Sequence, residues 1–217
     1  RLAAEMKLPI ALYNPKSRRR DWQLLKALEI CGRREALLAR DIGRPGEETV
    51  FTSSDRLLEE EELRESIHMT TLVILLGQGT FRGPASGKAA INLVGIGPGQ
   101  PSNLTQEASS ILTGSEKVFG AERYLRSIEG ITAARKVTHD GPWPERMAAR
   151  YDEASAVADR GGRAAILTGG DPSIFSSGWR ILDRAAKPIH ISPGVSAFSC
   201  VAARAGAPLV GDFVLLS

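Results

Sequence analysis

Short, continuously apolar runs alternate with amphipathic stretches along the whole chain, and this alternation constrains the fold more than any other feature. Strands covered on both faces are apolar at successive positions, because neither face meets water. We predict strands at Pro9–Tyr13, Thr49–Thr52, Thr71–Leu76, Ile91–Gly95, Lys117–Phe119, Ala164–Thr168, Ile189–Ser192 and Phe213–Leu216. We predict helices at Trp22–Cys31, Asp55–Ser66, Leu104–Thr113, Ala121–Ile128, Pro144–Arg160, Ser176–Ala186 and Val195–Ala205. The alternation predicts an α/β fold with mainly parallel sheets.

A small, polar segment containing glycine and proline divides the chain. Residues 83–89 have the composition of a linker. They separate residues 1–82 from residues 90–217, and each part is long enough for one domain with its own core. The sequence therefore predicts two α/β domains.

The composition argues against several classes of function. The net charge of +3 is too small on its own to indicate a nucleic-acid partner. Cys31 and Cys200 are too few and too far apart for a disulfide framework or a zinc site. No apolar run approaches the roughly 20 residues of a membrane span, and no apolar segment after Arg1 indicates a signal peptide. We expect a cytoplasmic protein without metal ion, nucleic acid or membrane contact.

A glycine-rich loop follows the predicted strand Ile91–Gly95 and leads into a predicted helix, with Ser102 or Asn103 as the expected N-cap. Glycines let the backbone take left-handed conformations and approach a ligand closely. A dinucleotide fingerprint would need a glycine where Gln100 stands. Pro98 also lacks the backbone donor that a phosphate would use. The loop fits either a ligand held by shape and carbonyl groups or a purely structural tight turn.

Two further glycine turns follow predicted strands. The first contains Gly169, Gly170 and Asp171, and the second contains Pro193 and Gly194. Asp171 stands at a predicted helix start, where a carboxylate is favourable, so capping is its ordinary role. Ligands in open α/β sheets bind outside the carboxyl ends of the strands. Three glycine-rich turns at three such ends predict a single cleft.

The order of these motifs resembles that of the tetrapyrrole methylase family. The set comprises Gly-Ile-Gly-Pro-Gly at 95–99 with Leu-Thr at 104–105, Gly-Asp-Pro at 170–172, Pro-Gly-Val-Ser-Ala at 193–197 and Ala-Gly-Ala-Pro at 205–208. The resemblance implies that S-adenosyl-L-methionine is the cofactor, that S-adenosyl-L-homocysteine is its product, and that the cofactor lies in a cleft between two α/β domains. The cofactor residues that it implies are Gly97, Pro98, Gly99, Gly169, Gly170, Asp171, Ile174, Phe175, Ser196 and Ala197.

A basic segment follows the first predicted strand. Four of the five residues from Lys16 to Arg20 are cationic; a solvated charge run is the ordinary explanation, but arginine also pairs well with carboxylates. The string LYNPKSRRRDWQL at 12–24 resembles the precorrin-3B C-17-methyltransferases and their cobalt-factor III counterparts within the family. This resemblance implies an acidic precorrin substrate. It assigns Lys16, Arg18, Arg19 and Arg20 to the substrate and adds Tyr13, Asn14 and Gly43 to the cofactor residues.

The two domains stand in the reverse of the family's order. Residues 1–82 resemble the family's C-terminal domain, and residues 90–217 resemble its N-terminal, cofactor-binding domain. Arg1–Met6 resembles the tail of the helix that joins the two domains in the family. We therefore predict a circular permutation with a shortened interdomain segment, which chains tolerate when their termini lie close together at the surface.

The resemblance implies methyl transfer to C-17 of a precorrin with ring contraction, in cobalamin biosynthesis, by a homodimer. The cofactor carries the activated methyl group, so the protein aligns the reactants and excludes water, and we expect no catalytic nucleophile. His139 is the one histidine considered for acid–base help, with a structural role favoured. The alternatives are a precorrin methyltransferase of other ring specificity, a diphthine synthase or ribosomal-RNA methylase of the same fold, and a catalytically silent binding module.

Overall fold

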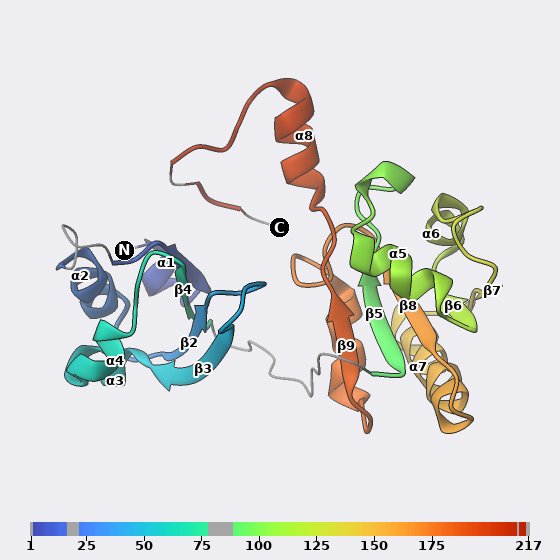
Figure 1. Cartoon of the computed structure of the whole chain (residues 1–217), viewed down its shortest axis with the longest axis horizontal. Coiled ribbons are helices and arrows are strands. Elements are labelled where there is room, and N and C mark those ends of the chain that lie inside the picture. The colour runs from blue at the N-terminus through green and yellow to red at the C-terminus, as the bar shows by residue number, and fades with distance from the viewer. Residues whose placement is uncertain (1, 17–21, 78–88, 212, 216–217) are drawn as a thin grey trace. The chain divides into compact units, whose positions relative to one another are not determined.

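The computed structural model describes residues 2–16, 22–77, 89–211 and 213–215. They fall into two compact units, one within Arg1–Arg82 and the other within Gly83–Ser217 (Figure 1). The predicted linker, residues 83–89, lies almost wholly outside the described residues. Each unit contains one sheet with helices packed on it. The α/β class predicted from the sequence is confirmed.

The sheet of the C-terminal unit is parallel, as predicted. Its strand order is β7-β6-β8-β5-β9, and its strands are β5 (Ile91–Gly95), β6 (Lys117–Phe119), β7 (Arg135–Val137), β8 (Ala164–Thr168) and β9 (Ile189–Ser192). Every residue of β5 and β8 is buried, which explains their continuously apolar sequences. The prediction omits β7, because this edge strand has two exposed basic residues and only one apolar residue.

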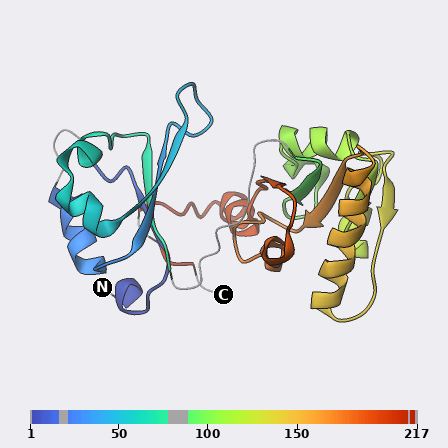
Figure 2. The same ribbon diagram turned by 90° about the horizontal axis from the view of Figure 1, so that it is seen from below.

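Helices cover both faces of this sheet. α5 (Gln106–Thr113) and α6 (Glu122–Ser127) share a buried apolar core with β5, β6 and β8. α7 (Trp143–Asp159) packs against the other face, mainly along β8 (Figures 1 and 2). This layering leaves the carboxyl ends of the parallel strands, and the loops that follow them, as the place where a ligand is expected.

The sheet of the N-terminal unit is antiparallel, so the prediction of mainly parallel sheets is wrong for this unit. Its order is β1-β4-β2-β3, with β1 (Ile10–Tyr13), β2 (Glu35–Arg40), β3 (Glu48–Ser53) and β4 (Thr71–Leu75). A short glycine-containing turn joins β2 to β3, and such a hairpin forces antiparallel pairing. The prediction omits β2, because Ala-Leu-Leu-Ala at 36–39 favours a helix, and its strand conformation depends on pairing with β3 and β4.

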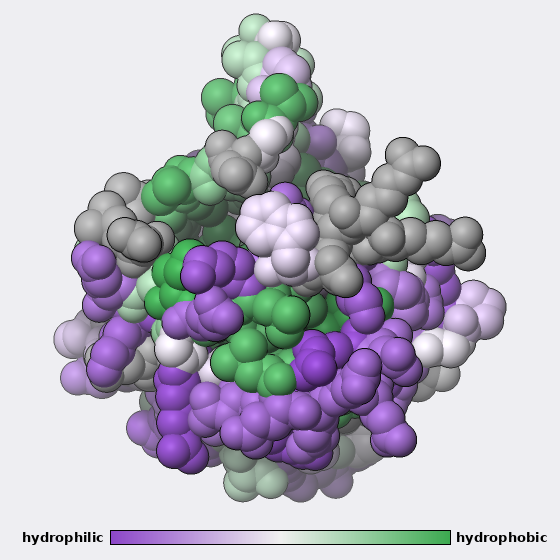
Figure 3. All heavy atoms as spheres, turned by 90° about the vertical axis from the view of Figure 1, so that its left-hand side faces the viewer, coloured by the Kyte–Doolittle hydropathy of each residue, from purple (hydrophilic) through white to green (hydrophobic). Residues whose placement is uncertain are grey.

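Helices cover one face of this antiparallel sheet. α2 (Trp22–Cys31), α3 (Ser54–Glu59) and α4 (Glu61–Glu65) pack their apolar residues on that face, and α1 (Leu2–Glu5) precedes β1. Seen from the side of α2 and α3 (Figure 3), the unit presents hydrophilic residues around a hydrophobic patch. The single helix predicted at Asp55–Ser66 is broken at Glu60, whose backbone is extended. The break lets Leu57 and Leu63, which would lie well apart around one helix, reach the same core.

Three predicted elements near the glycine loops also differ from the structure. A 3₁₀ turn, η1 (Pro101–Asn103), precedes α5, and a 3₁₀ segment, η2 (Ser177–Arg184), stands where an α-helix was predicted. α8 (Ala197–Ala205) begins two residues later than predicted and ends at Gly206, whose φ of 63° is left-handed. Residues 213–215 form no strand. In the described part of the chain, no helix combines the length and apolarity needed to cross a membrane.

Candidate functional site

Three glycine loops meet at the carboxyl ends of β5, β8 and β9. The backbone N–H of Gly97 donates to the carbonyl oxygen of Gly170 at 3.2 Å, and the N–H of Gly170 donates to the carbonyl of Gly97 at 2.8 Å. These two bonds form an isolated antiparallel bridge between the first loop and the second. The third loop joins them at Gly194. The structure therefore brings the three turns together in one cluster.

The loops pack backbone against backbone, and only glycine fits at two of the contacts. A Cβ on Gly194 would lie 2.1 Å from the carbonyl oxygen of Gly170 and 2.8 Å from the carbonyl carbon of Gly95. A Cβ on Gly95 would lie 2.7 Å from the same oxygen and from the backbone nitrogen of Gly194. The left-handed backbone that the sequence predicts for the loop glycines occurs at three other positions. Gly97, Gly99 and Gly170 have φ of 69°, 106° and 64°.

The outer side of the cluster is open at Gly99 and Gly170, and two polar atoms without partners are buried close by. A Cβ on Gly99 or on Gly170 would meet nothing within 4 Å. The Oδ1 of Asn103, a residue that lies against Gly97, and the Oγ1 of Thr168 are buried without a hydrogen-bond partner. Buried polar atoms are ordinarily bonded. Accessible backbone beside unsatisfied acceptors fits a small polar ligand.

The predicted helix N-cap near this cluster is wrong. Thr105, not Ser102 or Asn103, caps α5, and its hydroxyl accepts from the N–H of Ala108 at 3.0 Å. Ser102 and Asn103 belong to η1, which ends before the cap of α5 at Thr105. The side-chain oxygen of Asn103 therefore caps no helix and has no partner.

The capping role expected for Asp171 takes a different form. Its Oδ1 accepts from the N–H of Ser173 at 2.7 Å, which closes a turn, and no α-helix begins there.

Phe175, another predicted cofactor residue, has a left-handed φ of 50°, which is rare for a bulky residue, and it is 61% exposed. Pro98, Ile174 and Ala197 are exposed, and Ser196 precedes α8 without a side-chain capping bond. These residues lie on the loops as predicted, and their contact with a cofactor stays a prediction.

The predicted residues of the N-terminal unit gather around the end of β1 and the β2–β3 turn. Tyr13 is 87% exposed and lines a cavity of about 480 Å³ together with Asp41 and Ile42. Asn14 has a left-handed φ of 47°, and its buried Oδ1 has no partner. Gly43 has a φ of 77°, and its N–H donates to Glu47 in the turn. Their part in cofactor binding also stays a prediction.

The predicted basic substrate cluster is only partly described. The Nζ of Lys16 donates to the carbonyl oxygen of Arg64 at 3.1 Å, so this ammonium is tied to the end of α4. Arg18, Arg19 and Arg20 lie outside the described residues. The assignment of this cluster to the substrate therefore stays a prediction.

A basic pocket that the sequence reasoning missed lies beside the glycine loops. This cavity of about 540 Å³ is lined by Ala121, Arg123, Tyr124, Trp143, Arg146, Met147, Arg150, Leu167, Thr168, Gly169, Phe175, Ser176, Ser177 and Gly178. Burial, and secondarily the like charge of Arg146, lowers the pKa of Arg150, although its guanidinium stays cationic. The sequence feature that could have indicated this pocket is the pair Arg146 and Arg150. They are four residues apart on one predicted helix and therefore lie on the same face.

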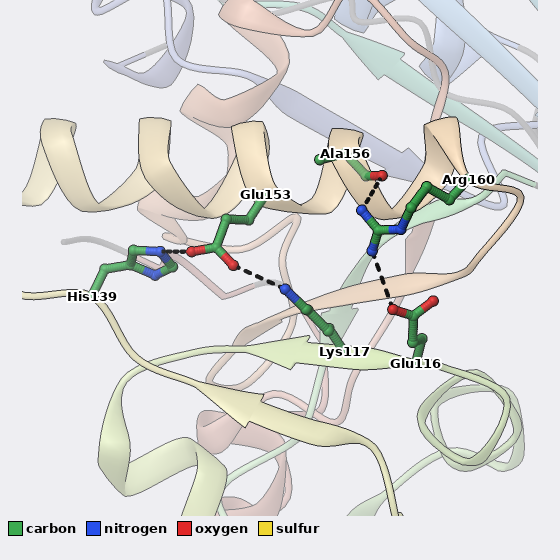
Figure 4. A network of polar contacts seen from close by, with 6 residues as sticks. All are labelled: Glu116, Lys117, His139, Glu153, Ala156 and Arg160. Carbon is green, nitrogen blue, oxygen red and sulfur yellow. Dashed lines mark hydrogen bonds and ion pairs between the residues drawn. The ribbon is translucent and has the colours of Figure 1, made fainter.

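His139 lies in a network of polar contacts with Glu153 and Lys117, and its structural role stays a prediction. Its Nε2 lies 2.9 Å from Oε1 of Glu153 on α7, and the Nζ of Lys117 donates to the other carboxylate oxygen at 3.2 Å (Figure 4). The bond with His139 is the main reason why the pKa of Glu153 lies below its usual value; burial opposes this effect and Lys117 adds to it. The contacts tie the segment after β7 to α7. No group of three metal-ligating side chains occurs among the residues with described positions.

Comparisons with known proteins agree with these motifs. The family described as Tetrapyrrole (Corrin/Porphyrin) Methylases matches residues 90–217. The cobalamin biosynthesis protein CobIJ of Mycobacterium tuberculosis is 29% identical over 175 residues, which cover 78% of this chain and 33% of that protein. The probable cobalt-factor III C(17)-methyltransferase of Salmonella typhimurium is 29% identical over 132 residues, 58% of this chain and 54% of that protein.

Two further relatives are similar over a comparable part. The precorrin-3B C(17)-methyltransferase of a Sinorhizobium species is 29% identical over 133 residues, 58% of this chain and 51% of that protein. A crystal structure of the methyltransferase CobJ is 27% identical, with a TM-score of 0.49, over 57% of this chain and 54% of that one. The chain thus spans between about a third and about half of the length of these curated relatives.

Proposed function

The chain belongs to the tetrapyrrole (corrin/porphyrin) methylase family, and on that premise we propose that it transfers a methyl group from S-adenosylmethionine to a ring carbon of a precorrin. The resemblance seen in the sequence is confirmed at the level of the family. The permuted order of the two domains stays a prediction.

The observation that carries the proposal is the convergence of the three glycine loops at one edge of the parallel sheet. The left-handed backbone at Gly97, Gly99 and Gly170 supports binding of the cofactor close to the main chain. The unpartnered side-chain oxygen of Asn103 would receive one of its donor groups. The other proposed cofactor residues are Pro98, Gly169, Asp171, Ile174, Phe175, Ser196 and Ala197, with Tyr13, Asn14 and Gly43 from the N-terminal unit.

The cofactor, when bound, supplies an electrophilic methyl group, so the chain needs no nucleophilic side chain of its own. The glycine loops hold the cofactor at a fixed place against the sheet, which reduces the entropy lost on reaching the reactive geometry. Asp171 contributes a carboxylate close to the loop cluster, where it would attract the ammonium group of the methionine part.

We further propose that the methylated carbon is C-17 and that ring contraction accompanies the transfer. Support comes from the names of the Salmonella and Sinorhizobium relatives, which are 29% identical to this chain over somewhat more than half of it, and from the basic segment at 16–20. Lys16 and Arg18–Arg20 would bind acidic arms of the substrate. The family resemblance also implies a homodimer, which sedimentation of the purified chain would test.

The test is transfer of label from methyl-labelled S-adenosylmethionine to precorrin-3B or cobalt-factor III. The proposal predicts that the label appears in the tetrapyrrole and that mass spectrometry places it on C-17. Label on another ring carbon would leave the methyltransferase assignment and contradict the C-17 assignment. No label in the tetrapyrrole, from a chain that binds S-adenosylhomocysteine, would favour a catalytically silent binding module.

A further inference from the structure

We propose that Arg123, Arg146 and Arg150 form a carboxylate-binding pocket within the C-terminal unit, which takes acidic side arms of the tetrapyrrole. This inference rests on the proposed function, since it names the part of the substrate that this surface recognises. It uses none of the basic residues assigned from the sequence, Lys16 and Arg18–Arg20.

The pocket lies at the ligand-binding edge of the parallel sheet. Its floor is formed by Ala121, which follows β6 and caps α6, and by Leu167–Gly169 at the carboxyl end of β8, and one wall is the first half of α7. Gly169 belongs both to this pocket and to the loop that bonds to Gly97 through its neighbour Gly170. A ligand in the pocket would therefore lie directly beside the proposed cofactor loops.

Buried polar atoms without partners concentrate in this pocket. Arg150 is only 7% exposed, and its Nε has no hydrogen-bond partner. The Nε of Arg146 and the Oγ1 of Thr168 are likewise buried and unpartnered. Leaving a buried charged donor unsatisfied is costly, so two such guanidinium nitrogens and a neutral hydroxyl around one cavity point to a ligand that accepts hydrogen bonds.

The positive charge of the pocket is not neutralised by the protein residues that the structure describes. Arg123 stacks on the ring of Tyr124, 4.7 Å from its centroid, and bonds to its hydroxyl. The Nη1 of Arg150 donates to the sulfur of Met147 at 3.8 Å. By contrast Arg160, near the end of the same helix but outside the pocket, pairs with Glu116 (Figure 4). The contacts of Arg123 and Arg150 are with neutral groups, so their positive charges favour binding of an anion.

The other side chains of the pocket favour a carboxylate on a flat ring. Tyr124, Trp143 and Phe175 line it, and aromatic side chains pack well against planar ring systems. A tetrapyrrole combines such a ring with acetate and propionate arms, and guanidinium groups bind carboxylates through paired hydrogen bonds. The methionine carboxylate of the cofactor is a competing source of the same chemistry, and binding measurements can separate the two.

The test is titration of the full chain with uroporphyrin III, a tetrapyrrole that carries acetate and propionate arms, followed by absorbance. S-adenosylhomocysteine binding is measured in parallel by calorimetry. The variants are Arg150→Met and Arg146→Gln, with Arg160→Gln as the matched control that removes one charge from the same helix. We expect the two pocket variants to weaken uroporphyrin binding by about 10- to 100-fold, as for a lost hydrogen bond to a charged group, and the control and the S-adenosylhomocysteine affinity to change less than about twofold.

The melting temperature of the Arg150→Met variant distinguishes ligand binding by Arg150 from a structural role in the fold. Because the charge of Arg150 is buried and unpaired, Arg150→Met is expected to leave the melting temperature unchanged or to raise it. A lower melting temperature together with unchanged uroporphyrin binding would assign Arg150 to the fold and overturn the proposal. Equal weakening of both ligands would assign the pocket to the cofactor and also overturn it.

The proposed function can fail separately. If the wild-type chain binds uroporphyrin through these arginines but does not bind S-adenosylhomocysteine, the pocket stands and the methyltransferase assignment does not. If the wild-type chain does not bind uroporphyrin, or if the pocket variants bind it as tightly as the control does, the pocket assignment is wrong whatever the cofactor result.

Discussion

Gly194→Ala tests the packing of the three glycine loops. The added methyl group would lie 2.1 Å from the carbonyl oxygen of Gly170 and 2.8–2.9 Å from the carbonyl group of Gly95. These contacts are with backbone atoms, so no side chain can rotate away. The φ of Gly194 is not left-handed, so the effect comes from crowding and not from an unsuitable backbone conformation.

Relieving the contact requires one loop to move by more than an ångström, and movement of the loop that carries Gly170 breaks its bonds with Gly97. Overpacking costs about 1–3 kcal/mol and occasionally more, and the added loss of the bridge places the expected destabilisation at about 3 kcal/mol. For a unit of this size, such a change lowers the melting temperature by roughly 10 °C.

Urea denaturation followed by circular dichroism measures the decrease in the free energy of unfolding. Faster hydrogen exchange at β5, β8 and β9 would show that the destabilisation lies in the C-terminal unit. The matched control is Gly114→Ala, at the end of α5, where a Cβ would meet its nearest atom at 3.3 Å. The control is expected to change stability by less than about 1 kcal/mol. Equal stability of the two variants would refute the close packing of the loops.

Three further changes test other parts of the structure. Thr105→Ala removes the side-chain cap of α5 and should lower the free energy of unfolding by about 1 kcal/mol, whereas Thr105→Ser should largely preserve it; urea denaturation compares the two. Tyr151→Phe removes the hydroxyl that accepts from the N–H groups of Ala186 and Lys187, and a loss of about 1 kcal/mol by the same method is expected; no loss would mean that water replaces the hydroxyl. Glu153→Gln removes a carboxylate whose pKa is lowered mainly by His139, so its stabilisation is present above the unfolded pKa of about 4.3 and is lost as the pH falls through the lower folded value. The variant should therefore be less stable than the wild type near pH 7, and the difference should shrink as the pH falls below the folded pKa of Glu153; a difference independent of pH would contradict this assignment.

The sequence predicted the C-terminal sheet well, because its inner strands are buried on both faces. β5 and β8 have every residue buried, so the continuous apolar pattern alone identified them with correct bounds. β7 and β2 escaped prediction because their conformation depends on neighbouring strands. The antiparallel pairing of the N-terminal unit depends on the β2–β3 hairpin, which a list of apolar runs does not reveal.

The candidate site was predictable where it depends on backbone shape. Positive φ at Gly97, Gly99 and Gly170 is a property that glycine itself indicates. The contact of Gly194 with Gly170 was not predictable, because it joins loops far apart in the sequence. The basic pocket was missed for the same reason, since its side chains come from α6, α7, β8 and the start of η2 and are brought together only by the fold.

Calorimetric titration of S-adenosylhomocysteine tests whether the glycine-loop cluster binds the cofactor. If it does, one molecule binds per chain and the binding saturates. Asp171→Asn keeps an acceptor for the N–H of Ser173 but removes the charge, and it should weaken binding by about tenfold. The control Asp152→Asn, at an exposed position on α7, should leave the affinity unchanged. A folded wild-type chain that does not bind S-adenosylhomocysteine would contradict the assignment of the glycine-loop cluster to the cofactor.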